Sequence, residues 1–154
     1  MTKILFICHG NICRSPMAEY VMQHMVRERH LEYKYHIESA ATSREEIGND
    51  VHYGTKGKLR EVGIACPRRA ARQVTKADYD EYDYLVVMDQ MNIRNLHRII
   101  GDDPDHKVYK LLEFAGGNRD IADPWYTGNF DETYDDVVEG VTALIEKIES
   151  ETRK

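Results

Sequence analysis

The chain has 154 residues, of which 42% are hydrophobic and 31% charged, the balance of one ordinary soluble domain that buries a core. Its 21 Lys and Arg stand against 27 Asp and Glu, giving a net charge of −6. The basic residues are spread along the chain, which argues against a nucleic-acid partner. The longest apolar run near the start, residues 4–7, is too short for a signal peptide or membrane span, so we expect no membrane partner. Three cysteines cannot form a disulfide framework, and we therefore expect a reducing, cytoplasmic location.

The first two predicted elements are a strand and a helix joined by a short loop. Residues 3–7 form an apolar run without alternation, which is typical of a strand buried on both faces. From Met17 onward, apolar residues recur at every fourth position, as on a helix with one apolar stripe. Ser15 is a common N-cap residue and Pro16 suits the first helical position, so we expect this helix to begin there.

Strands and helices continue to alternate along the rest of the chain, with no repeat and no linker rich in Pro, Gly or Ser. We expect strands at residues 35–41, 84–88 and 108–112, and helices at residues 51–62, 92–100 and 137–148. This alternation predicts an α/β fold: a single domain over residues 1–154, with a central parallel sheet of about four strands and helices on both faces. Ligands bind such sheets beyond the carboxyl ends of the strands, where the loop after the first strand lies.

That loop, residues 8–15, has the composition of an anion site, and we call it the phosphate loop. Gly10 permits unusual backbone angles, and successive amide N–H groups in such a loop can form a nest that binds an anion. Arg14 can fold back and hold two oxygens of a tetrahedral oxyanion. The helix N-terminus adds partial positive charge, and these surroundings favour the thiolate form of Cys8. One loop therefore offers a nucleophile and a phosphate cradle.

The residues of the loop allow two other interpretations. Cys8 could end the strand as a small buried hydrophobic residue, with Arg14 as a surface charge. The pattern Cys-x5-Arg-Ser between a buried strand and a capped helix favours the phosphate cradle instead. Cys8 and Cys13 could ligate a metal, but such a site needs two more ligands and no second Cys or His pair has suitable spacing. We expect neither a metal nor another cofactor.

The low-molecular-weight protein tyrosine phosphatases have a signature that resembles residues 6–19 of this chain, FICHGNICRSPMAE. The resemblance continues through SAAT at 39–42, ARQ at 71–73, MD at 88–89 and DPWY at 123–126, and it covers essentially the whole chain. It implies phosphotyrosine-containing proteins as partners, among them autophosphorylated tyrosine kinases, and a monomeric enzyme.

The resemblance also implies a role for each site residue by its position. Cys8 would attack phosphorus to form a phosphocysteine intermediate, while Arg14 holds the phosphate oxygens. Asp123 would protonate the leaving phenolate and then activate water. Ser15 would support the thiolate and Asn11 the strained loop backbone. The implied phosphate-binding and loop-supporting residues are His9, Gly10, Asn11, Ile12, Cys13 and Ser15, and the implied walls of the substrate site are Trp125 and Tyr126.

The chain departs from the family pattern at two places. Ala41 stands where Gly is common, so that backbone position accepts a methyl group. Residues 67–72 read PRRAAR where many members have His before Ala-Arg, so we carry over no histidine brace for the loop. We expect Arg68, Arg69 and Arg72 to lie in a solvated loop.

Two alternative functions were considered beside hydrolysis of phosphotyrosine. An arsenate reductase of the same fold needs two further cysteines to relay a disulfide, and beyond the phosphate loop the chain has only Cys66. A non-catalytic phosphopeptide-binding or redox-sensing module needs no general acid, so Asp123 argues for an enzyme. We also expect redox regulation, in which Cys13 forms a reversible disulfide with an oxidised Cys8.

Overall fold

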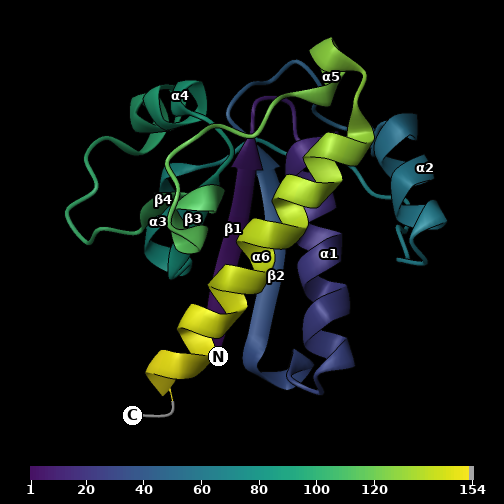
Figure 1. Cartoon of the computed structure of the whole chain (residues 1–154). Coiled ribbons are helices and arrows are strands. Elements are labelled where there is room, and N and C mark those ends of the chain that lie inside the picture. The colour runs from purple at the N-terminus through teal and green to yellow at the C-terminus, as the bar shows by residue number, and fades with distance from the viewer. Residues whose placement is uncertain (153–154) are drawn as a thin grey trace.

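In the computed structural model, which describes residues 1–152, four parallel strands form one central sheet (Figure 1). The strands are β1 (Thr2–Cys8), β2 (Tyr35–Ala41), β3 (Tyr84–Val87) and β4 (Val108–Lys110), and their order in the sheet is β2-β1-β3-β4. β1 pairs along its whole length with β2 and on its other side with β3. The predicted parallel α/β sheet of about four strands is confirmed.

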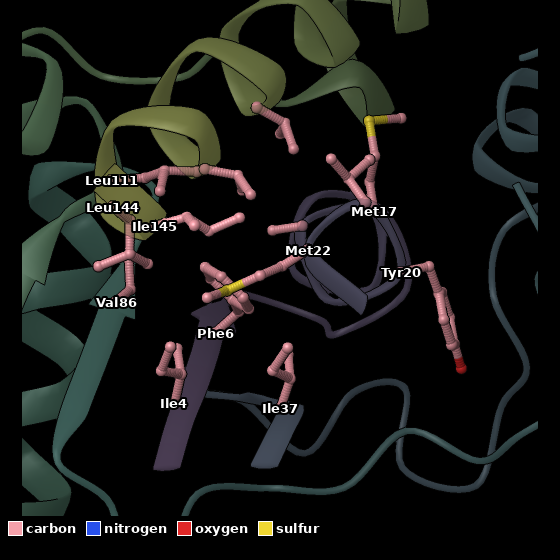
Figure 2. Close-up of a cluster of buried hydrophobic side chains, with 14 of the residues drawn as sticks. Ile4, Phe6, Met17, Tyr20, Met22, Ile37, Val86, Leu111, Leu144 and Ile145 are labelled. Carbon is pink, nitrogen blue, oxygen red and sulfur yellow. The ribbon is translucent and has the colours of Figure 1, made fainter. Parts of the chain in front are cut away.

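Helices cover both faces of the sheet because the side chains of the central strand point alternately to each face. Ile4 and Phe6 are fully buried in a cluster beneath α1 (Arg14–Glu28) and α6 (Phe130–Thr152), as Figure 2 shows. Leu5 and Ile7 are fully buried in a second cluster, beneath α3 (Lys76–Glu81) and α4 (Gln90–Ile100). The unbroken apolar run of β1 therefore reflects burial on both sides.

The remaining elements are short. α2 (Tyr53–Glu61) packs beside α1 and α6, and α5 (Pro124–Thr127) lies beyond the carboxyl ends of β1 and β2 (Figure 1). Two 3-10 helices, η1 (Glu32–Lys34) and η2 (Leu111–Ala115), precede β2 and follow β4. None of the helices within residues 1–152 combines the length and the apolar composition needed to cross a membrane.

The expectation that Ser15 caps the first helix is wrong. α1 begins at Arg14 and its N-cap is Cys13, without a capping side-chain hydrogen bond. The Ser15 hydroxyl lies 3.1 Å from the Cys8 sulfur instead. The Ser15 hydroxyl therefore contacts the buried sulfur of the loop and does not cap the helix.

Other element boundaries differ for reasons of length and composition. The last predicted helix starts earlier, at Phe130, because its first two turns are mostly polar and only Phe130 and Tyr134 continue the apolar period there. β4 ends at Lys110, since Leu111 and Leu112 belong to η2. α3 and α5 have six and four residues, too few to display a helical period.

Close packing between α6 and η2 generates a prediction about stability. A Cβ added at Gly140 would lie 2.4 Å from Cγ and 3.1 Å from the carbonyl oxygen of Leu111. We expect Gly140→Ala to lower the free energy of unfolding by about 1–3 kcal/mol, because the side chain and backbone of Leu111 must move. Urea denaturation followed by circular dichroism measures the change.

The matched control is Gly57→Ala, in the middle of α2, where the added Cβ meets no atom within 4 Å. This variant should raise the free energy of unfolding by about 0.5–1 kcal/mol, since Ala is the better helix former. A Gly140→Ala protein as stable as wild type would contradict the proposed tight contact.

Candidate active site

Cys8 is the last residue of β1 and the first of the phosphate loop, at the carboxyl edge of the sheet. Its side chain is buried, and two backbone N–H donors and one hydroxyl group surround its sulfur. The backbone nitrogens of Asn11 and Ser15 lie 3.3 Å and 3.4 Å from Sγ, and Ser15 Oγ lies 3.1 Å away. Donors that converge on one sulfur stabilise negative charge there, which is what a thiolate nucleophile requires.

Asn11 gives the loop its curvature. Its φ of 59° lies in the left-handed region, which Asn tolerates better than most residues. Its side-chain amide donates to Ser15 Oγ at 2.8 Å and to Ser39 Oγ at 2.9 Å, and its side-chain oxygen accepts from the Arg72 backbone N–H at 3.3 Å. The unusual backbone conformation is therefore fixed from three sides.

Arg69 also holds Asn11 in place, through the backbone carbonyl group of Asn11. Its guanidinium donates to the carbonyl oxygen of Asn11, and at 3.4 Å to that of Asn49. The Arg69 backbone N–H donates to Asp50 Oδ1 at 3.1 Å. A guanidinium thus contacts the loop in a chain whose sequence shows no histidine brace.

The expectation of a solvated arginine loop is wrong for two of its three residues. Arg69 contacts the phosphate loop, and Arg72 pairs with the buried Asp78 at 2.9 Å, whereas Arg68 is exposed. The reason is a backbone contact: the Ala41 N–H donates to the carbonyl oxygen of Arg72 at 2.8 Å. This bond holds the segment against the end of β2, directly behind the phosphate loop.

Arg14 is only 2% exposed and lies among opposite charges. Its Nη1 donates to Asp89 Oδ2 at 2.7 Å and to the Ile121 carbonyl oxygen at 2.9 Å, while Nη2 lies 3.5 Å from Asp123 Oδ2. Burial lowers the pKa of the guanidinium, but the negative charges of Cys8 and the two carboxylates outweigh it, and the pKa is raised. The side chain is therefore a permanent cation beside the sulfur.

One atom of Arg14 points to a ligand. Within residues 1–152, its Nε is buried and has no hydrogen-bond partner. A buried donor without a partner costs about 1–3 kcal/mol. An oxyanion on the loop would accept this hydrogen bond, so the geometry is that of a site completed by an anion.

Asp123 approaches the loop from the far end of the chain. It is the N-cap of α5, and its Oδ1 accepts the Trp125 backbone N–H at 3.1 Å. Trp125 and Tyr126 follow on the same turn of helix and are 56% and 82% exposed. α5 therefore presents one carboxylate and two aromatic rings above Cys8.

A pocket of about 100 Å³ lies between these parts. The pocket brings together eight of the site residues predicted from the sequence. The other three, Asn11, Arg14 and Ser15, are buried and do not line it. Glu45 and Glu46 line the pocket but were not predicted as site residues. Glu45 Oε2 lies 2.9 Å from His9 Nε2 at the rim. The residues that line the pocket are Cys8, His9, Gly10, Ile12, Cys13, Glu45, Glu46, Asp123, Trp125 and Tyr126.

Asp89 is a residue of the site that the sequence alone did not single out. Asp89 and Asn92 form a capping box at the start of α4, and this D-x-x-N pattern is visible in the sequence. Its contact with Arg14 is not visible there, because that contact depends on the neighbouring positions of β1 and β3 in the sheet.

Comparisons with known proteins agree with this geometry. A family model described as low molecular weight phosphotyrosine protein phosphatase matches residues 3–154. The low molecular weight protein-tyrosine-phosphatase YfkJ of Bacillus subtilis is 38% identical over 153 residues, 98% of each chain. A low molecular weight phosphotyrosine protein phosphatase of Gallus gallus is 40% identical over 151 residues, 94% of each chain.

Solved structures show the same similarity. The crystal structure of YfkJ from Bacillus subtilis matches with a TM-score of 0.94, over 98% of this chain and 96% of that one. A protein tyrosine phosphatase from Entamoeba histolytica, solved with Hepes in its active site, matches with a TM-score of 0.90 at 29% identity, over 99% of each chain.

The contact between Arg69 and Asn11 leads to a binding prediction. We expect Arg69→Leu to weaken the binding of inorganic phosphate by about 10-fold, because a charged hydrogen bond that fixes the loop backbone is lost. Isothermal titration calorimetry measures the dissociation constant. Arg68→Leu removes the same charge from the exposed neighbour and should stay within about 2-fold of wild type. Equal weakening in both variants would indicate long-range charge and not the hydrogen bond.

Proposed function

The chain belongs to the low molecular weight phosphotyrosine protein phosphatase family, and we propose that it hydrolyses phosphotyrosine in proteins with Cys8 as the nucleophile. One observation carries this proposal: two backbone N–H donors and the Ser15 hydroxyl converge on the Cys8 sulfur beside the buried cation Arg14. A nucleophile and an oxyanion site that share one loop suit transfer of a phosphoryl group to sulfur.

In the first step, the phosphate group lies on the loop amides with its oxygens on Arg14. Asp89 and the Ile121 carbonyl oxygen hold Nη1, whereas Nη2 has only the 3.5 Å contact with Asp123 and Nε has no partner within residues 1–152, so Nε and Nη2 can offer a bidentate contact. The Cys8 sulfur attacks phosphorus, an S–P bond forms and the bond from phosphorus to the tyrosyl oxygen breaks. Asp123 gives its proton to the departing phenolate.

In the second step, water hydrolyses the phosphocysteine. Asp123, now a carboxylate, takes a proton from the water as its oxygen attacks phosphorus, and the S–P bond breaks. The departing thiolate of Cys8 returns to the Ser15 hydroxyl and the loop amides that surround its sulfur. Inorganic phosphate leaves, and no atom of the enzyme is consumed.

The aromatic residues of α5 support a preference for phosphotyrosine over phosphoserine. Cys8 lies at the bottom of the pocket, and Trp125 and Tyr126 stand at its rim. A phenyl ring is long enough to carry phosphate to the loop and broad enough to contact both walls. His9 and Ile12 line the same space.

The partners and location follow from the same proposal. Phosphotyrosine-containing proteins, including autophosphorylated tyrosine kinases, are the proposed partners of a monomeric enzyme that acts in the cytoplasm without a metal, nucleic acid or membrane. The free state of Cys8, Cys13 and Cys66 is in keeping with a reducing compartment. Cys66 lines a different pocket, with Lys56 and Arg60, so a disulfide relay as in an arsenate reductase finds no support at the loop.

Redox protection by Cys13 is a further part of the proposal. Burial raises the pKa of Cys13 to about 12, so this residue is a thiol at neutral pH and reacts slowly with peroxide. Peroxide would transfer an oxygen to the Cys8 thiolate and give a sulfenic acid. The Cys13 thiol would then condense with it, forming a disulfide and releasing water.

The nucleophile is tested with Cys8→Ser. Wild type should release phosphate from a phosphotyrosyl peptide, and the variant should lose turnover by about 1,000-fold or more, because the less reactive hydroxyl replaces the thiolate. Phosphate binding should persist, since the loop amides and Arg14 remain. A malachite-green assay and calorimetry measure the two properties. Cys66→Ser is the matched control and should keep full activity, whereas an active Cys8→Ser enzyme would refute the assignment.

Asp123→Asn isolates proton transfer, because Asn still caps α5 but cannot act as an acid. We expect kcat to fall by about 100-fold for aryl phosphates with basic phenols, and much less for p-nitrophenyl phosphate, whose leaving group needs little protonation. A series of aryl phosphates measures the dependence on phenol pKa. Asp131→Asn, at an exposed carboxylate, should follow the wild-type line. A uniform loss across the series would contradict the role as general acid.

Cys13→Ser tests redox protection. After peroxide, wild type should lose activity and regain most of it with dithiothreitol, because a disulfide is reducible. The variant should lose activity and recover poorly, since its sulfenic acid oxidises further. Residual activity and a mass spectrum after each treatment give the measurement. Equal recovery in the two proteins would leave Cys13 as a packing residue.

A further inference from the structure

His52 lies at the junction of the phosphate loop and α2. Its backbone N–H donates to the carbonyl oxygen of Ile12, in the loop, at 2.9 Å. Its ring Nδ1 accepts the Gly54 N–H at 3.0 Å and so caps α2. Thr55 Oγ1 adds a bond to the carbonyl oxygen of Cys13 at 3.2 Å. The start of α2 is therefore anchored to the residues that follow Cys8 in the loop.

The His52 ring also joins a cluster of aromatic side chains from three segments. It stacks on Phe130, the first residue of α6, with ring centroids 5.6 Å apart and planes 12° apart. It meets Trp125 edge-on, with centroids 5.5 Å apart and an angle of 73°. Its third neighbour is the exposed Tyr53, at 4.3 Å. The ring thus stacks against α6 and makes an edge-to-face contact with α5.

Gly54 shows how close this packing is. A Cβ at this position would lie 2.2 Å from Cζ of Phe130, so only Gly lets that ring reach the start of α2. Phe130 also packs on Ile12 and Cys13 of the phosphate loop. The surface on which the His52 ring rests is therefore fixed by the loop and by α6 together.

Trp125 depends on such a contact because 56% of its surface is exposed. Burial alone does not hold a ring of that exposure in one orientation. Its backbone N–H donates to Asp123 Oδ1 at 3.1 Å, so the placement of Trp125 and of the Asp123 carboxylate are linked. An edge-to-face contact contributes the equivalent of about a 2- to 10-fold change in a conformational population.

We infer that the His52 ring is a positioning group that holds Trp125, and through it Asp123, over the phosphate loop. The inference rests on the proposed function of Asp123 and Trp125, but the placement of the ring is a separate property. His52 does not touch the reacting atoms in this scheme; it acts through α5.

The competing explanation is that His52 serves only as the N-cap of α2, and two substitutions separate the roles. His52→Asn keeps a capping oxygen and removes the ring. His52→Phe keeps an aromatic ring and removes the capping acceptor. A capping role predicts a defect in the Phe variant alone, whereas a positioning role predicts a defect at α5 in the Asn variant alone. His24→Asn, on α1, is the matched control for the same substitution at a remote site.

The first measurement is fluorescence, because Trp125 is the single tryptophan of the chain. In His52→Asn, the acrylamide quenching constant of Trp125 should rise by about 2-fold, as the edge contact is lost. His52→Phe and His24→Asn should quench as wild type does. Wild-type quenching in the Asn variant, or equal changes in the Asn and Phe variants, would overturn the inference. If His52→Asn does not fold, His52→Asp provides the same cap without a ring.

The second measurement distinguishes a defect in the phosphate loop from a defect in the aromatic walls of the substrate site, Trp125 and Tyr126. In His52→Asn, kcat/KM for a phosphotyrosyl peptide should fall by about 3- to 10-fold, while the inhibition constant of inorganic phosphate stays unchanged. A merely structural defect would weaken phosphate inhibition in parallel and would overturn the inference. If wild type fails to hydrolyse the peptide, the proposed function fails, and the fluorescence of Trp125 still decides the role of His52.

Discussion

Arg14 carries a positive charge where only 2% of its surface is exposed, and groups that follow β3 and that lie at the start of α5 balance that charge. A buried ion is strongly destabilising unless opposite charges and hydrogen bonds surround it. Asp89, which follows β3, and the carbonyl oxygen of Ile121, which precedes α5, both bind the same Nη1. The strand order places β3 directly beside β1, so the carboxyl ends that carry Asp89 and Cys8 are neighbours. The anion site therefore depends on the topology of the sheet.

The conformation of the phosphate loop is a second consequence of the need to balance the buried charge of Arg14. Amides converge on Cys8 only if the chain turns sharply, and Asn11 at a φ of 59° makes that turn. A strained residue persists when its surroundings determine it, and here Ser39 and Arg69 bind its side chain and its carbonyl group. β2, which carries Ser39, and the segment that carries Arg69 thus support the conformation of Asn11. The loop is rigid because other segments hold it, and not because of its own composition.

These dependencies explain what the sequence alone could predict. The apolar run of β1, the pattern from Cys8 to Arg14 and the alternation of elements are local, and they predicted the sheet and the loop correctly. Ser15 is a common N-cap residue, which is a local signal. Its hydroxyl nevertheless lies 3.1 Å from the Cys8 sulfur and does not cap the helix. Arg69 and Asp89 join the site by contacts between segments more than 50 residues apart in sequence, as the separations of 58 and 75 positions show. No periodicity or spacing encodes such contacts.

The two carboxylates beside Arg14, Asp89 and Asp123, differ in how they are held. Asp89 is fully engaged: Oδ1 accepts the Asn92 N–H at 2.7 Å and Oδ2 binds Arg14 at 2.7 Å. Both oxygens of Asp89 thus accept short hydrogen bonds, which suits a counter-ion of Arg14. Asp123 keeps a longer approach to Arg14, 3.5 Å, and lies on a helix of only four residues whose rings are exposed. Within residues 1–152, its Oδ2 has only this long contact with Arg14. The difference in their surroundings therefore suits Asp89 to charge balance and supports the proposal that Asp123 transfers the proton.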